Sequence, residues 1–215
     1  MRRLQGIWYG VLRIVTRPLF VCVFGIRVYH RERLPREGGV LAVSNHQSYL
    51  DPILAAVGMP RPFHPMARES LFRFAPFRWL IRSLYAFPVR RGRADVGAVR
   101  EALRRLKGGA VVLVFPEGTR TRDGSIGPLH GGPVPIAARA GVPILPMVID
   151  GAFEAWPRWQ PLPLPFRIRV ACGRAVRVDE AAERDPEAFM AAVRAEMLEL
   201  QSDLHRLRDV PKKNR

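Results

Sequence analysis

Cysteine and acidic residues are scarce in this sequence. Its 215 residues include two Cys, and 19 Asp and Glu stand against 35 Lys and Arg. Cys22 and Cys172 lie far apart and match neither a metal-binding nor a redox spacing, so we expect two reduced, buried thiols in a cytosolic protein. Neither has neighbours in the sequence that would activate a thiol, which argues against a cysteine nucleophile.

The shortage of acidic residues leaves a formal net charge of +16. A surplus of this size calls for an acidic partner, which is an anionic membrane, an anionic substrate or nucleic acid. Nearly all of the surplus is arginine, and codon bias in a GC-rich genome accounts for part of it, so charge alone does not choose among these partners. The hydrophobic content of 48% is ordinary for a globular chain and argues against general disorder.

Long uncharged apolar runs are also missing. Residues 7–28 are mostly apolar, but Arg13, Arg17 and Arg27 interrupt them, and the longest uncharged run covers only residues 18–26. A helix that spans a bilayer needs about 20 apolar residues. A signal peptide is not expected either, because no small-residue cleavage site follows.

The spacing of the apolar residues instead predicts an amphipathic helix within residues 1–24. Arg13 and Thr16 fall on its polar side, and Pro18 is expected to end or kink it. Arginine opposite Trp and aliphatic side chains is typical of a helix that lies in a membrane interface; packing against the chain's own domain is the alternative. The apolar side comprises Leu4, Ile7, Trp8, Val11 and Val15.

From residue 25 onward, strand patterns alternate with helical patterns. This alternation indicates an α/β fold: a single domain, residues 25–215, with a mostly parallel mixed sheet covered by helices on both faces. After an extended piece at 25–30, strands are expected at residues 40–44, 63–67, 85–89, 110–115, 143–149 and 166–171. Helices are expected at residues 52–57, 72–84, 95–106, 134–139 and 186–207.

His46 directly follows the predicted strand at 40–44, and open α/β sheets collect ligands at such strand ends. Asp51 comes five residues later as a predicted helix N-cap, before Pro52. In a continuous helix, residues five apart point about 140° apart, so the two side chains meet only if a turn separates them. A carboxylate that orients an imidazole leaves the other ring nitrogen free to take a proton from an alcohol. An ordinary turn is the structural alternative, and Ser48 fits a turn role better than that of a nucleophile.

A second polar segment, Phe-Pro-Glu-Gly-Thr-Arg, occupies residues 115–120 after the strand predicted at 110–115. Gly118 would let a ligand approach the backbone and leave amides free to bind an anion. Thr119 adds a hydroxyl and Arg120 a planar fork suited to phosphate, while Glu117 would hold arginines or accept from a substrate hydroxyl. If the two strands are neighbours, both polar segments face one crevice.

Four segments together resemble the glycerolipid acyltransferase family. Residues 45–51 resemble its catalytic block, a His and an Asp separated by four residues, and residues 115–120 match its third block. Residues 87–92 and 142–146 resemble its second and fourth blocks more loosely. The resemblance covers roughly residues 25–155 and implies that residues 25–215 form an acyltransferase domain behind a membrane-associating segment at 1–24.

The resemblance implies that His46 is the general base and that Asp51 orients it. The residues implied to bind the acceptor are Arg91, Glu117, Gly118, Thr119 and Arg120. The implied reaction moves an acyl chain from acyl-CoA or acyl-carrier protein to the sn-2 hydroxyl of 1-acylglycerol 3-phosphate, giving phosphatidic acid. It passes through no acyl-enzyme and needs no metal or other cofactor.

We therefore expect anionic membrane lipids, a lysophospholipid acceptor and the acyl donor as partners, and no nucleic acid. The expected location is peripheral or monotopic, on the cytoplasmic face of the cell membrane. Arg90 and Arg68 depart from the family pattern, which keeps other acceptors open: glycerol 3-phosphate, a lyso-ornithine lipid or another lysophospholipid. A non-catalytic basic protein that binds membranes or nucleic acid is the alternative from another class.

Overall fold

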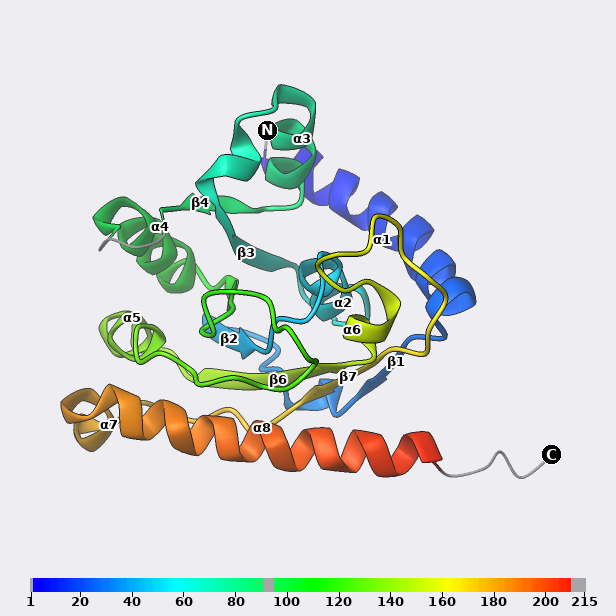
Figure 1. Cartoon of the computed structure of the whole chain (residues 1–215). Helices are drawn as coiled ribbons and strands as arrows, with labels where there is room; N and C mark the ends of the chain where they lie inside the picture. The colour runs from blue at the N-terminus through cyan, green and yellow to red at the C-terminus, as the bar shows by residue number, and fades with distance from the viewer. Residues whose placement is uncertain (1, 91–94, 210–215) are drawn as a thin grey trace.

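Seven strands form one sheet in the order β1-β7-β6-β2-β5-β3-β4 (Figure 1). The computed structural model describes residues 2–90 and 95–209. Strands β2 to β6 run parallel to one another, while β7 pairs antiparallel with β6 and parallel with β1. The predicted mostly parallel mixed sheet is therefore confirmed. The strands are β1 (Arg27–Tyr29), β2 (Val40–Ser44), β3 (Phe63–Arg68), β4 (Phe87–Val89), β5 (Val111–Val114), β6 (Ile144–Asp150) and β7 (Arg169–Cys172).

Helices cover both faces of this sheet, as predicted. One face packs against α1 (Arg2–Phe24), α2 (Asp51–Val57) and α6 (Ala152–Ala155). The other face packs against the helices drawn below the sheet and at its left in Figure 1. These are α4 (Val96–Lys107), α5 (Pro133–Ala140), α7 (Glu180–Arg184) and α8 (Pro186–Asp209). The helix α3 (Ala75–Ser83) and the 3-10 turns η1 (Arg31–Arg33) and η2 (Glu69–Phe72) complete the described elements.

The central strand β2 shows why the sheet was readable from the sequence. All five of its residues are buried. Val40 and Ala42 join the core on the α1 side. Leu41 and Val43 join the core on the α8 side. A strand covered on both faces has no solvent side, so its sequence is continuously apolar instead of alternating.

The structure contradicts the expected helix end at Pro18, whereas a kink there stays a prediction, and it contradicts the expected burial of Cys22. Pro18 does not end α1, which continues to Phe24. Pro18 is exposed, and its ring lacks the N–H that would pair with the carbonyl one turn earlier. Cys22 is exposed on the same helix and is not a buried thiol, whereas Cys172 is buried as expected. Burial raises the pKa of Cys172 to about 12.

The apolar side of α1 faces away from the domain. Tyr9, Phe20 and Phe24 are the buried side chains through which the helix contacts its neighbours. By length and composition, Gly6–Phe24 is also apolar enough to cross a membrane, with a mean hydropathy of 1.5, despite Arg13 and Arg17. The exposed apolar residues are Ile7, Trp8, Val11, Ile14, Val15, Leu19, Val21 and Val23. An outward apolar side is the arrangement expected for contact with lipid.

We predict that Gly39→Ala destabilises the fold. A methyl group at Gly39, just before β2, would overlap the backbone carbonyl of Leu106 and lie 2.8 Å from Cγ1 of Val142. Overpacking of this kind lowers the free energy of unfolding by about 1–3 kcal/mol, which urea denaturation would measure. Gly10→Ala is the control, because no atom lies within 4 Å of its added methyl group. Equal stability of the Gly39 variant and wild type would contradict the prediction.

Candidate active site

The polar segments that follow β2 and β5 lie side by side. Val43 of β2 is opposite Val114 of β5 in a parallel pair, so both strands end at the same edge of the sheet. The backbone N–H of His46 donates to Oε1 of Glu117 over 3.0 Å. The N–H of Thr121 donates to the carbonyl oxygen of His46 over 2.8 Å. The two segments are therefore hydrogen-bonded to each other, as the expected single site requires.

The carboxylate of Asp51 meets the imidazole of His46. Oδ2 of Asp51 lies 2.7 Å from Nδ1 of His46. The same oxygen accepts the backbone N–H groups of Gln47, at 2.6 Å, and Ser48, at 2.7 Å. The predicted turn between the two residues is thus what brings them together. The Asp51 side chain is fully buried, and the His46 side chain is only 12% exposed.

Asp51 is not the N-cap of α2, contrary to expectation. Leu50 occupies that position, and Asp51 is the first helical residue, followed by Pro52. Its carboxylate turns back to the N–H groups that precede the helix and does not cap the first turn. The hydroxyl of Ser48 accepts the N–H of Leu50 over 3.2 Å, which is the turn role that we expected for it.

Asp51 also determines which ring nitrogen of His46 carries the hydrogen. Burial raises the pKa of Asp51, while the imidazole and the two N–H groups counteract that rise. A carboxylate acceptor at Nδ1 keeps the imidazole hydrogen on that atom, so Nε2 carries the lone pair. The ring also stacks on Phe115, with 4.2 Å between centroids and 21° between planes. The imidazole is therefore held both at one edge and on one face.

Two side chains that the sequence analysis did not single out fix the His46 segment from the other direction. Asn45 is buried and bonds to Ile149 of β6 twice, donating to its carbonyl and accepting from its N–H, both at 2.8 Å. Gln47 donates to the carbonyl of Gly124 over 2.8 Å and accepts the N–H of Phe153 over 3.3 Å. The position of these two residues on either side of His46 was the only sign in the sequence that they help to hold it. Their partners could not be predicted, because they lie more than 75 residues away in the chain.

Glu117 faces the backbone of the same site. Its carboxylate accepts hydrogen bonds from the N–H groups of His46 and Gly127. Burial raises its pKa to about 7, and the nearby charge of Asp51 adds to that rise, while the two N–H groups oppose it. Glu117 thus holds the residue that carries the imidazole, in addition to any contact that it makes with a ligand.

Arg120 supplies a positive charge next to the turn that joins His46 to Asp51. Its guanidinium carbon lies 3.5 Å from the centroid of the Tyr49 ring. Its Nη1 is shielded from solvent and has no hydrogen-bond partner among the described residues. Tyr49 in turn contacts Trp156, with ring centroids 5.4 Å apart. Stacking thus fixes the cation while leaving an N–H group available to an anion.

The other predicted site residues divide into two groups. Gly118 adopts a left-handed φ of 70°, which explains the glycine, and both Gly118 and Thr119 are exposed at the turn. Arg91, together with the end of the second family-like segment, lies outside the described residues. The structure therefore brings together His46, Asp51, Glu117 and the turn up to Arg120.

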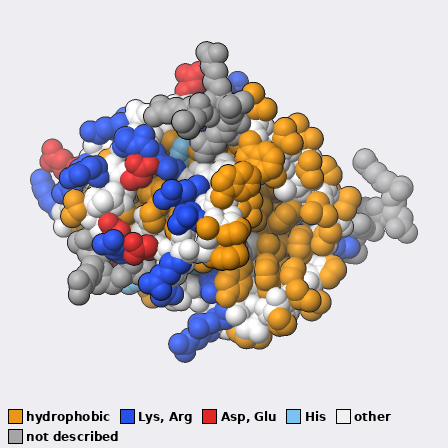
Figure 2. All heavy atoms as spheres, turned by 90° about the horizontal axis from the view of Figure 1, so that it is seen from above, with side chains coloured by type: hydrophobic (Ala, Val, Ile, Leu, Met, Phe, Trp, Pro, Cys, Tyr) orange, Lys and Arg blue, Asp and Glu red, His pale blue; other side chains and the backbone are white. Residues whose placement is uncertain are grey.

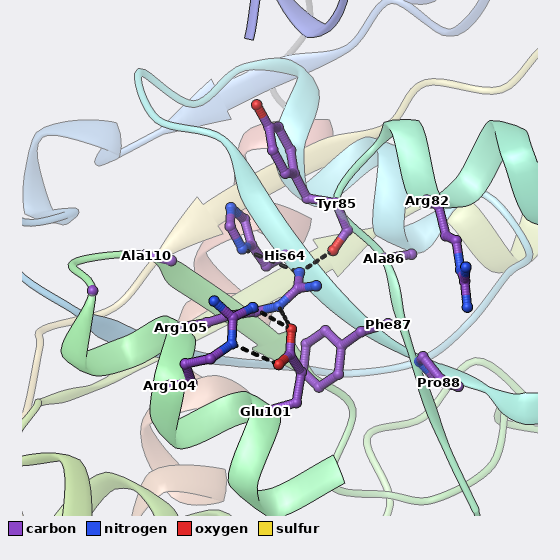
Figure 3. A pocket seen from close by; sticks show the side chains of 11 residues that line it. His64, Arg82, Tyr85, Ala86, Phe87, Pro88, Glu101, Arg104, Arg105 and Ala110 are labelled. Carbon is purple, nitrogen blue, oxygen red and sulfur yellow. Dashed lines mark hydrogen bonds and ion pairs between the residues drawn. The ribbon is translucent and has the colours of Figure 1, made fainter. Parts of the chain in front are cut away.

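A cavity of about 630 Å³ lies at the other end of the sheet, beside the starts of β3 and β4 (Figure 3). In Figure 3, the carboxylate of Glu101 points toward Arg104 and Arg105, with which it pairs. Burial and the charge of Arg105 lower the pKa of His64 to about 4, so this histidine is neutral. None of the strand-end residues described above lines this cavity, which is separate from the His46 site.

Comparison with known proteins agrees with the geometry of the strand ends. A family model described as Acyltransferase matches residues 25–150, more than half of the chain. The match contains the His46, Asp51 and 115–120 segments and begins just after α1.

Curated relatives carry one recurrent name. The chain is 33% identical over 128 residues to a 1-acyl-sn-glycerol-3-phosphate acyltransferase of Bacillus subtilis, which covers 59% of this chain and 63% of the relative. It is 30% identical over 168 residues to the protein of that name from Pseudomonas aeruginosa, covering 75% and 64%. The chain thus spans less than two thirds of the length of these relatives.

A solved structure extends the likeness to nearly the whole chain. The crystal structure of the 1-acyl-sn-glycerophosphate acyltransferase PlsC from Thermotoga maritima superposes with a TM-score of 0.77 at 25% identity. The superposition covers 94% of this chain and 82% of that one. The likeness therefore includes the arrangement of the sheet and its helices as well as the segments around the site.

We predict that Glu117→Gln changes the pH dependence of stability. The pKa of Glu117 rises from 4.5 to about 7 on folding. Between those values the folded chain retains a proton that the unfolded chain releases, so the free energy of unfolding falls as pH rises. Glutamine does not titrate, and the stability of the variant relative to wild type should therefore increase across this window and level off above about pH 7.

Urea denaturation across this range would measure the effect. Glu199→Gln, at an exposed position on α8, controls for the simple loss of a carboxylate. A stability difference for the Glu117 variant that does not change with pH would contradict the prediction.

Proposed function

The chain belongs to the acyltransferase family, and on that premise we propose that it transfers an acyl chain to the sn-2 hydroxyl of 1-acylglycerol 3-phosphate, giving phosphatidic acid. The donor is acyl-CoA or acyl-carrier protein. The names of the relatives and of the superposed structure support this choice of acceptor. The observation that carries the proposal is the His46–Asp51 pair, 2.7 Å apart, beside the stacked cation of Arg120.

In the proposed reaction, Nε2 of His46 takes the proton of the acceptor hydroxyl. Asp51 holds the hydrogen on Nδ1 and stabilises the imidazolium that forms. The hydroxyl oxygen attacks the thioester carbonyl, the carbon–sulfur bond breaks, and the departing thiolate receives the proton from His46. Because the acceptor attacks directly, the reaction needs no nucleophile from the protein, and we propose it without a resident metal or cofactor.

Arg120 and the turn that precedes it would bind the acceptor's phosphate. The unpaired Nη1 of Arg120 can donate to a phosphate oxygen, and its stacking on Tyr49 lowers the entropy lost on binding. Gly118 and Thr119 are exposed in the same turn and would add backbone and hydroxyl contacts. We include Arg91 in the acceptor site by family resemblance alone, and Glu117 as the group that holds His46 and adjoins the acceptor.

The acceptor and product are lipids, so the enzyme should work at a membrane. The outward apolar side of α1 supports a peripheral or monotopic attachment through residues 1–24. We propose the cytoplasmic face of the membrane, where soluble acyl donors and the anionic lipids that attract a chain of +16 are found.

We predict that His46→Ala lowers kcat by about 10²- to 10⁴-fold, since the variant lacks the base. Asp51→Asn should lower kcat within the same range, because an amide that donates to Nδ1 would move the imidazole hydrogen to Nε2. Thiol release from acyl-CoA in the presence of lysophosphatidic acid measures both. His30→Asn is the control, since His30 is exposed and its left-handed backbone suits asparagine. A His46→Ala protein of near wild-type rate would refute the assignment.

We predict that Arg120→Gln acts mainly on the acceptor's KM. Loss of a charge-assisted hydrogen bond to phosphate should raise KM for lysophosphatidic acid about tenfold or more. The KM for 1-acylglycerol, which lacks the phosphate, should not change. Arg139→Gln, at an exposed position on α5, is the control for loss of charge. If the variant raised both KM values equally, phosphate recognition by Arg120 would be excluded.

A further inference from the structure

The segment from Trp156 to Leu164, between α6 and β7, exposes large apolar side chains. Trp159 is 62% exposed, Leu162 is 72% exposed and Leu164 is 57% exposed. The segment is nevertheless held in shape: the indole N–H of Trp156 donates to the carbonyl of Gln160, and the N–H of Leu164 donates to that of Ala155. Its apolar side chains are thus presented outward by an ordered backbone.

This 156–164 segment leads back to the C-terminal end of α1. Phe24, the last residue of α1, accepts a hydrogen bond from the N–H of Ile168, just beyond the segment. At the other end of α1, Trp8 contacts Trp79 of α3, with ring centroids 5.9 Å apart, and donates to the hydroxyl of Ser83. The helix α3 and the turn before it add exposed apolar residues of their own: Leu71, Phe74, Phe77, Trp79 and Leu80.

These three elements form a surface with one kind of chemistry. Figure 2 shows hydrophobic side chains gathered over one half of the face seen from above, while the other half carries Lys and Arg together with several Asp and Glu. The ranges 2–24, 71–90 and 156–167 contain arginines but neither Asp nor Glu. They also contain all four tryptophans of the chain, at positions 8, 79, 156 and 159. Tryptophan and arginine beside aliphatic residues suit the boundary between lipid headgroups and acyl chains.

We propose that the 156–164 segment and α3 enter the same anionic lipid surface as α1, so that the domain itself contacts the bilayer beside its active site. Contiguous apolar surface of this extent is unusual on a soluble monomer. The absence of acidic residues matches a negatively charged lipid surface, and continuity with α1 makes that surface the occupant. This proposal rests on the proposed function, because a lipid acceptor would reach the active site from the bilayer.

The 156–164 segment also contacts the turn between His46 and Asp51. Trp156 contacts Tyr49, on which Arg120 stacks. The ring of Phe153 contacts that of Trp159 edge to face at 5.4 Å, and the N–H of Phe153 donates to the side chain of Gln47. Lipid bound at the segment would therefore lie next to the residues that surround His46.

Fluorescence quenching by lipids brominated on their acyl chains tests the proposal. In one full-length protein, Trp8, Trp79 and Trp156 are changed to Phe, so that only Trp159 remains; in a second, only Trp8 remains. Both should be quenched by mixed vesicles of phosphatidylglycerol and phosphatidylcholine. A third protein, with all four changed to Phe and with Leu207→Trp at an exposed position on α8, should not be quenched, because α8 packs on the other face of the sheet from α1.

Quenching of Trp8 without Trp159 would mean that α1 binds lipid alone and would overturn the proposal. Absence of quenching in all three proteins would overturn it as well, and so would equal quenching of the α8 control, which would indicate contact without a preferred face.

A second measurement separates lipid contact from internal packing. The combined substitutions Trp159→Ser, Leu162→Ser and Leu164→Ser should lower acyl transfer to lysophosphatidic acid in vesicles about tenfold, because apolar area is lost from the lipid contact. The rate in detergent micelles should stay unchanged. Val96→Ser with Leu207→Ser, at exposed apolar positions on α4 and α8, is the matched control.

Equal loss of activity in vesicles and micelles would assign the segment a structural role and overturn the proposal. If the unaltered chain transferred no acyl group in either system, the proposed function would fail, while the quenching result would still decide the lipid contact by itself.

Discussion

The site depends on one oxygen atom, Oδ2 of Asp51. It receives the imidazole of His46 and the N–H groups of Gln47 and Ser48, all within 2.7 Å. A fully buried carboxylate without such donors would be costly to keep ionised, and a turn with unpaired N–H groups would be costly to bury. Each therefore stabilises the other, and the imidazole is oriented because the same oxygen serves both purposes. The start of α2 at Asp51 fixes where that oxygen can be.

The parallel sheet supplies the second constraint, because it brings distant segments to one edge. Asn45 ties the end of β2 to Ile149 of β6, while Glu117 ties it to the end of β5. His46 is thus held through Asn45 to the backbone of β6, by the Glu117 side chain that follows β5, and by Asp51. An imidazole held in this way loses little entropy when a ligand binds, which is the benefit expected of a preorganised site.

Burial explains which features could be predicted from the sequence. The strands β2 and β5 were readable because strands covered on both faces are continuously apolar. The turn that joins His46 to Asp51 was readable because helix geometry left no other way for them to meet. The roles of Asn45 and Tyr49 were not, since their partners come from β6 and from the 115–120 turn, and strand register is not encoded locally. Pro18 misled because Phe20 and Phe24, beyond the proline, pack in a core made with distant parts of the chain, which a local pattern does not reveal.

The polar site and the exposed apolar surface of the molecule together suit an amphiphilic acceptor, which has both a polar and an apolar part. A lysophospholipid must keep its acyl chain in lipid while its phosphate and hydroxyl reach a polar site. A soluble enzyme would have to extract the whole molecule and would lose the free energy of keeping that chain in lipid. Here Arg120 stacks on Tyr49, and Tyr49 contacts Trp156, where the exposed apolar segment begins. If that segment lies in the bilayer, the cation proposed to bind phosphate stands at headgroup level, and the acceptor can react without leaving the membrane.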